Sequence, residues 1–130
     1  MTTTLATVTF LVRDYDEAIA WFTKALKFQV LEDVDQGEGK RWVVVAPVSG
    51  VGAKLLLAKA ANAEQKKAIG NAAGGRVAFF LHTDYFDADH AQMLAAGVRF
   101  RETPRSEAYG KVAVFEDLYG NGWDLIGPAV

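Results

Sequence analysis

Four side chains of this chain have types suited to chemistry. His82 could act as a general base or as a metal ligand, because the unperturbed pKa of histidine lies near 6.5. Arg76 could hold a carboxylate or phosphate through two parallel hydrogen bonds. His82, Asp87 and His90 could together meet around a metal ion, although their spacing matches no standard ligand motif. The sequence has no cysteine, which excludes disulfides, thiolate metal sites and cysteine nucleophiles.

Both histidines also have plainer structural interpretations. His90 shares helical spacing with Phe86, Met93 and Leu94, so we expect it on the apolar face of a helix, tucked into the core. His82 ends a strand-like run, and it could instead hydrogen-bond to the helix that follows.

Aromatic side chains could line a pocket for a flat organic ligand, which is a common composition for small-molecule sites. Such side chains are also frequent in ordinary cores. A loop predicted over residues 107–110 could use a Tyr hydroxyl to orient a ligand. The candidates are Trp42, Phe80, Tyr109 and Phe115.

The composition excludes several classes of protein. The 130 residues suit one domain, and 51% hydrophobic with 23% charged residues is ordinary for a globular protein. The formal charge of -2 shows no basic excess, so we expect no nucleic-acid partner. No apolar run approaches the roughly 20 residues of a membrane span. The first residues lack the pattern of a signal peptide, so we expect a cytoplasmic protein without a membrane partner.

An internal repeat in the sequence indicates how the strands and helices that position these residues are arranged. Phe10-Leu-Val-Arg-Asp-Tyr15 returns 70 residues later as Phe80-Leu-His-Thr-Asp-Tyr85. Each copy is a strand-like run that leads into a segment with helical spacing, which predicts a duplicated module.

We predict two β-α-β-β-β modules, over about residues 5–58 and 76–127, with a connector over about 59–75. Asp14 and Asp84 are expected to cap the two main helices, and Gly97 to end the second. A short helix is predicted at 63–69. Strands are predicted at 5–12, 28–32, 41–46, 53–58, 76–82, 98–101, 111–115 and 123–126. This pattern predicts an α+β fold, in which helices cover one side of curved, mainly antiparallel sheets.

Two stretches resemble a known superfamily. Val12-Arg-Asp-Tyr-Asp-Glu-Ala18, followed by Trp21-Phe22 and Leu26-Lys-Phe28, is similar to the opening of vicinal-oxygen-chelate proteins. The stretch from Val114 to Leu125 is similar to their closing turn and last strand. This superfamily includes glyoxalase I, bleomycin-resistance proteins and extradiol dioxygenases. Lys27 replaces the usual glycine, and Leu118 and Tyr119 replace Pro and Asp. The resemblance covers nearly the whole chain and implies paired modules around a cavity.

Many members of that superfamily bind a divalent metal in the cavity, through His, Gln and Glu side chains. Carried onto this sequence, the four ligand positions fall on Thr7, Leu56, Arg76 or Ala78, and Asp124. Leucine, alanine and arginine cannot ligate a hard divalent ion. We therefore expect a cavity without a metal cofactor.

The resemblance then leaves three functions open. The first is binding of a small organic anion or aromatic compound, with Thr7, Trp42, Leu56, Arg76, Phe80, Tyr109 and Asp124 as the ligand-binding residues. The second is an enzyme, using His82 and Asp124 in acid–base catalysis or a relocated metal near His82 as an isomerase, lyase or dioxygenase. The third is a structural dimer in which Arg76 pairs with Asp124 in a closed cavity. The resemblance also implies a homodimer, because members of that superfamily often build their cavities from paired modules across two chains.

Overall fold

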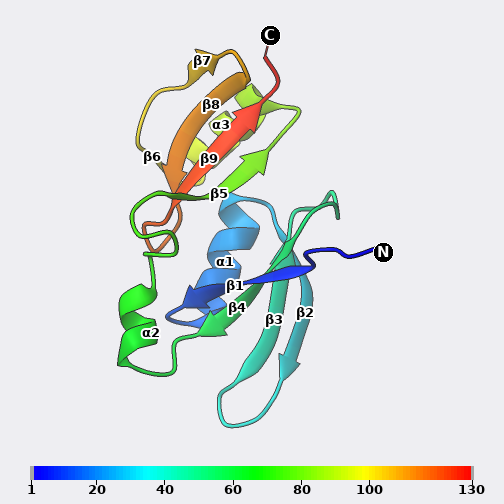
Figure 1. Ribbon diagram of the computed structural model, residues 1–130, viewed down its shortest axis with the longest axis vertical. Coiled ribbons are helices and arrows are strands. Elements are labelled where there is room, and N and C mark those ends of the chain that lie inside the picture. The colour runs from blue at the N-terminus through cyan, green and yellow to red at the C-terminus, as the bar shows by residue number, and fades with distance from the viewer. Residues whose placement is uncertain (1, 130) are drawn as a thin grey trace. The chain divides into compact units, whose positions relative to one another are not determined.

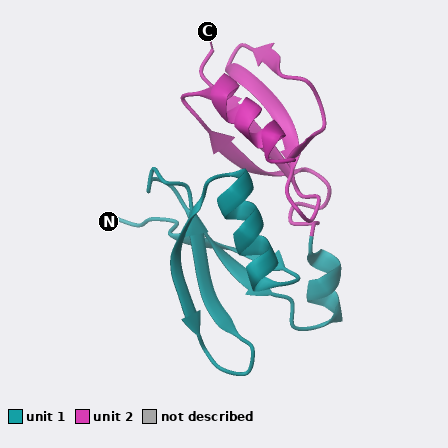
Figure 2. Ribbon diagram, turned by 180° about the vertical axis from the view of Figure 1, so that it is seen from behind, with its two compact units in different colours: residues 1–69 teal, residues 70–130 magenta. Residues whose placement is uncertain are grey.

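The computed structural model describes residues 2–129, and the chain divides into two compact units, residues 1–69 and 70–130 (Figure 2). The boundary falls inside the segment predicted to be a connector. Each unit contains one sheet with a helix packed on it, and the strands are mainly antiparallel (Figure 1). The predicted α+β fold class is confirmed.

Unit 1 is built around a four-stranded sheet with the order β1-β4-β3-β2. Strands β1 and β4 are parallel, and the other two pairings are antiparallel. The side chains that α1 and the sheet enclose are apolar, with Phe22 fully buried against Phe10 and Phe28. The elements are β1 (Thr7–Val12), α1 (Tyr15–Ala25), β2 (Gln29–Asp35), β3 (Arg41–Ala46), β4 (Lys54–Lys59) and α2 (Ala63–Ala68).

Unit 2 repeats this plan with the order β5-β9-β8-β6 and adds a short strand, β7, that pairs with β8. The sequence analysis missed β7, because Arg105-Ser-Glu107 has no apolar alternation and depends on the edge of β8 for its pairing. Tyr109 consequently lies in a tight hairpin turn rather than in a loop. The elements are β5 (Val77–His82), α3 (Phe86–Ala95), β6 (Arg99–Phe100), β7 (Arg105–Glu107), β8 (Gly110–Glu116) and β9 (Gly122–Gly127).

The two main helices begin differently. Asp14 caps α1 as predicted, and its carboxylate accepts the Glu17 N–H at 2.8 Å. The predicted cap at Asp84 is wrong. Tyr85 occupies the cap position of α3, and the Thr83 hydroxyl accepts the Tyr85 N–H at 3.0 Å and bonds to the Asp89 carboxylate.

The sequence repeat is displaced by one residue from the structural repeat. Helix α1 begins at Tyr15 and α3 begins at Phe86, one residue later than a 70-residue repeat predicts. Phe10 is 2% exposed, whereas Phe80 is 62% exposed. A shift of one residue moves a strand side chain to the opposite face of the sheet. The two phenylalanines are therefore not equivalent.

Shortly after its last residue, each of the helices α1 and α3 is followed by a residue in the left-handed region. Gly97 has φ 88° and Lys27 has φ 58°. The next residue donates its N–H back into the helix, from Phe28 to Phe22 at 3.1 Å and from Val98 to Met93 at 3.0 Å. Lysine is strained in this conformation and glycine is not.

Replacing Lys27 by Gly should stabilise the protein by about 0.5–1 kcal/mol, because the strain relieved exceeds the entropy that glycine adds to the unfolded chain. The matched control, Gly97→Ala, should destabilise by a similar amount, since nothing lies within 4 Å of an added Cβ and strain is the main cost. Urea unfolding of both variants measures the effect. A stability loss in Lys27→Gly would contradict the argument.

Candidate functional site

A groove of about 600 Å³ opens in unit 1 where β3 and β4 separate. The two strands pair only from Val43 to Val45 and from Leu55 to Leu57. Beyond those pairs, the β2–β3 hairpin and the segment that follows β4 form the two walls. The groove is lined by Tyr15, Gln36, Glu38, Gly39, Lys40, Arg41, Trp42, Leu56, Leu57, Ala58, Lys59, Ala60, Ala61 and Gln65.

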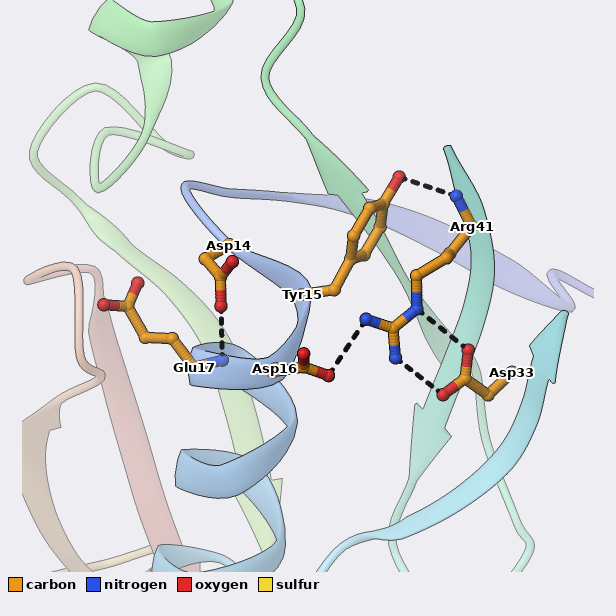
Figure 3. Close-up of polar contacts among 6 residues, drawn as sticks. All are labelled: Asp14, Tyr15, Asp16, Glu17, Asp33 and Arg41. Atoms are coloured by element: carbon orange, nitrogen blue, oxygen red, sulfur yellow. Dashed lines mark hydrogen bonds and ion pairs between the residues drawn. The ribbon is translucent and has the colours of Figure 1, made fainter. Parts of the chain in front are cut away.

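The Tyr15 side chain occupies the opening between the strands. Tyr15 is the first residue of α1, it is 6% exposed, and its hydroxyl oxygen accepts the Arg41 backbone N–H at 3.1 Å (Figure 3). That N–H belongs to the end of β3 where pairing with β4 has stopped. A helix side chain thus satisfies a strand donor, and the groove persists without an unpaired buried N–H.

The Arg41 guanidinium holds this end of unit 1 together. It donates to both Asp33 oxygens, at 3.1 and 2.8 Å, and to Asp16 at 2.9 Å (Figure 3). It also lies 5.2 Å from the centre of the Tyr15 ring. The hydrogen bonds from Arg41 lower the pKa of Asp33. The charge of Arg41 is therefore already paired with two carboxylates of the protein.

Trp42, Leu56 and Ala58 supply apolar surface to the groove. Trp42 is 39% exposed, and its indole N–H donates to the Glu32 carboxylate at 3.3 Å. Of the predicted ligand-binding residues, the structure brings Trp42 and Leu56 together here. Thr7 lies on β1 and is not among the described residues that line the groove.

Asp124 forms a second polar position, on the sheet of unit 2. It lies between Phe80 of β5 and Val114 of β8 in the strand register. Its Oδ1 atom is buried and has no hydrogen-bond partner among residues 2–129. Burial raises the pKa of Asp124; the Arg105 charge opposes this shift and the Glu102 charge adds to it.

The predicted Arg76–Asp124 pair is wrong. Arg76 precedes β5 and is exposed, and no ion pair within residues 2–129 joins it to Asp124. The register places Phe80 opposite Asp124, because an irregularity between Val77 and Phe79 shifts the parity of β5. The charges that act on Asp124 come from Glu102 and Arg105. Sequence reasoning missed Arg105 because it missed β7.

The histidines occupy different settings. His90 stacks on Phe86 at 5.8 Å and meets Phe100 edge-on at 4.5 Å, which confirms it as a half-buried core residue. His82 is exposed and lies opposite Ile126. Thr83, rather than His82, bonds to the following helix. A catalytic role for His82 with Asp124 stays a prediction.

Two further aromatic candidates, Phe115 and Tyr109, lie in unit 2. Phe115 is fully buried between Phe100 and Trp123, so it belongs to the core of unit 2 and lines no open pocket. Tyr109 is 62% exposed, and its hydroxyl lies 3.5 Å from the Arg105 guanidinium.

The side chains present do not fit the metal that the fold family implies. Of the positions Thr7, Leu56, Arg76 or Ala78, and Asp124, only Asp124 offers a carboxylate. Asp87 is bound to Lys111 at 2.6 Å, and it does not form a cluster with His82 and His90. Among residues 2–129, no three His, Asp or Glu side chains group closely enough to hold a metal ion.

The raised pKa of Asp124 predicts a pH-dependent contribution to stability. The folded state holds this proton more tightly than the unfolded state, so the contribution falls as pH rises from about 3.8 through the raised pKa. Asp124→Asn should remove this component, and the wild-type-minus-variant difference should decline with pH and then level off. Urea unfolding from about pH 4 to pH 8 measures it. Glu102, Arg105 and His82 share this side of the sheet and remain in both proteins, so a pH-independent difference would contradict the prediction.

Within residues 2–129, no helix is long and apolar enough to cross a membrane.

Comparisons with known proteins agree with this architecture. The family model "Glyoxalase/Bleomycin resistance protein/Dioxygenase superfamily" matches residues 4–125. An uncharacterised protein of Shewanella frigidimarina is 52% identical over 120 residues, covering 92% of this chain and 89% of that protein. YurT of Bacillus subtilis, also uncharacterised, is 30% identical over 114 residues, covering 85% and 87%.

Solved structures are similar over nearly the whole chain. The structure of UcmS2 has a TM-score of 0.82 and 30% identity, covering 97% of this chain and 98% of that one. TnmS3, described as an antibiotic binding protein from Streptomyces sp. CB03234, has a TM-score of 0.77 and 26% identity, covering 99% and 98%. The chain belongs to the glyoxalase/bleomycin resistance protein/dioxygenase superfamily.

Proposed function

We propose that the protein binds a flat, aromatic organic molecule in the groove of unit 1, without a resident metal ion. The observation that carries this proposal is the groove itself, whose volume of about 600 Å³ lies in the range of small-molecule sites. Trp42, Leu56 and Ala58 offer an apolar surface against which an aromatic ring can pack.

The groove contains an aromatic ring whose position is held by a hydrogen bond. The hydrogen bond to Glu32 restrains the Trp42 ring before a ligand binds. Binding therefore costs less side-chain entropy at Trp42. The similarity to TnmS3 supports binding rather than turnover, since that relative is described as an antibiotic binding protein. The misfit of the metal positions supports binding that uses packing and hydrogen bonds.

Fluorescence titration with a panel of fused-ring aromatic compounds tests the proposal. Trp42→Ala should weaken binding by about tenfold, because it removes about 1 kcal/mol of stacking together with the apolar contact area of the ring. Trp21→Ala is the matched control: Trp21 packs on Phe22 and does not line the groove, so this variant should keep its affinity. Equal loss in both variants, or no saturable binding by any compound, would reject the groove as the site.

We also propose a homodimer. Apolar side chains are exposed on β2 of unit 1, namely Val30, Leu31 and Val34, and Phe80 is exposed on β5 of unit 2. Sedimentation equilibrium measures the mass, and a monomer at about 100 µM would reject this proposal.

A further inference from the structure

We propose that the ligand of the unit 1 groove carries an anionic or oxygen-acceptor group as well as its aromatic ring, and that Tyr15, Lys40 and Lys59 bind that group. The inference rests on the proposed function and specifies its ligand class. It depends on three features of the groove: a hydroxyl hydrogen with no acceptor, two ammonium groups with no counterion, and a guanidinium that is already neutralised.

The Tyr15 hydroxyl is a donor held at the wall of the groove. Its oxygen accepts the Arg41 backbone N–H, and no acceptor for its own hydrogen occurs among residues 2–129. A phenol can donate and accept at once. Because Tyr15 is 6% exposed and lines the groove, an acceptor oxygen of a bound ligand could complete this pair.

Lys40 and Lys59 are also among the residues that line the groove. Neither side chain forms an ion pair or hydrogen bond within the described part of the chain. Arg41 is bound to Asp33 and Asp16, so it attracts an anion less than these lysines do. Glu38 is the one carboxylate among the lining residues, which leaves an excess of positive charge.

The polar groups and the aromatic surface belong to the same groove, whose lining residues come from both walls. Lys40 precedes Arg41 in the chain, and the Arg41 N–H bonds to the Tyr15 hydroxyl. Lys59 follows Ala58 on β4. An anionic group in this setting would accept charge-assisted hydrogen bonds, with its ring against Trp42. The donors are available for a carboxylate, a sulfonate or a phenolate, and they disfavour a cation.

Two fluorescent probes isolate the effect of the charge. 8-Anilinonaphthalene-1-sulfonate and N-phenyl-1-naphthylamine share an anilinonaphthalene ring system, and they differ by the sulfonate. We expect the sulfonate probe to bind at least about tenfold more tightly to the wild type. Lys59→Gln and Lys40→Gln should each remove about fivefold of that preference and leave the affinity for the neutral probe unchanged.

Lys66→Gln is the matched control, because Lys66 is an exposed lysine of α2 that does not line the groove. Tyr15→Phe should also reduce the preference for the sulfonate, and a retained preference in that variant would remove Tyr15 from the proposal. Near-ultraviolet circular dichroism reports whether each variant keeps its fold, so a global loss of structure is recognised.

The outcomes separate the two proposals. Equal affinity for both probes, with loss of both on Trp42→Ala, would overturn the charge inference while supporting aromatic binding in the groove. If Trp42→Ala left the affinity for both probes unchanged, the proposed function itself would be overturned. A sulfonate preference that falls equally in Lys66→Gln and Lys59→Gln would indicate a general effect of net charge, and it would overturn the assignment to these lysines.

Discussion

Asp117→Asn should lower the free energy of unfolding by about 2–3 kcal/mol. Asp117 is 5% exposed, and its two oxygens accept four hydrogen bonds. One oxygen accepts the backbone N–H groups of Tyr119 and Asn121, at 2.9 and 3.1 Å. The other accepts the Asn121 side-chain amide and the Trp123 indole N–H, both at 2.9 Å.

An asparagine at this position has one oxygen and an NH₂ group, so two donors of the protein would face a donor in a buried site. Leaving such groups unsatisfied carries the desolvation penalty that makes this substitution expensive. Asp84→Asn is the control, because Asp84 is exposed and its carboxylate forms no hydrogen bond within residues 2–129. Urea unfolding should show a change below about 0.5 kcal/mol for the control. A change below about 1 kcal/mol for Asp117→Asn would mean that these four bonds matter little.

Phe10→Ala should destabilise the protein by about 3–4 kcal/mol, whereas Phe80→Ala should change its stability by less than about 0.5 kcal/mol. Phe10 is buried and packs edge-on against Phe22, with ring centres 5.2 Å apart. Phe80 is 62% exposed. The 70-residue sequence repeat alone would assign equal effects to the two.

Thermal or urea unfolding of the two alanine variants decides between these expectations. Leu81→Ala provides a further comparison, because Leu81 lies beside Leu125 as Phe10 lies beside Leu57. If Phe80→Ala proved as damaging as Phe10→Ala, the one-residue displacement between the two units would be wrong.

The sequence predicted most of the helices and strands, because hydrophobic spacing and caps are local signals. Tyr15, Ile19 and Phe22 recur at helical spacing in the printed sequence. The Asp14 cap is visible there as well. The short strand β7 gives no such signal, since its pairing with β8 is what makes it a strand. Its absence from the prediction removed Arg105 from the surroundings of Asp124.

The candidate site was harder to predict, because it depends on register and on contacts between distant residues. The Arg76 prediction assumed regular alternation along β5, and the irregularity between Val77 and Phe79 breaks that alternation. The groove in unit 1 depends on Tyr15 meeting Arg41, two residues that lie 26 positions apart in the chain. Trp42 and Leu56 could be proposed as ligand contacts from the sequence, but the polar neighbours that complete the groove could not.

The position of β9 within its sheet has a consequence for synthesis on the ribosome. β9 is the last strand of unit 2 to be made, yet it lies between β5 and β8. In unit 1, β4 likewise follows β2 and β3 but lies between β1 and β3. Each nascent sheet therefore stays open along its middle until its final strand emerges, with the earlier strands exposed to wrong partners. A pause in translation before Lys54 or before Gly122 would prolong that exposure, whereas a pause just after β4 leaves the ribosome would let the first sheet close.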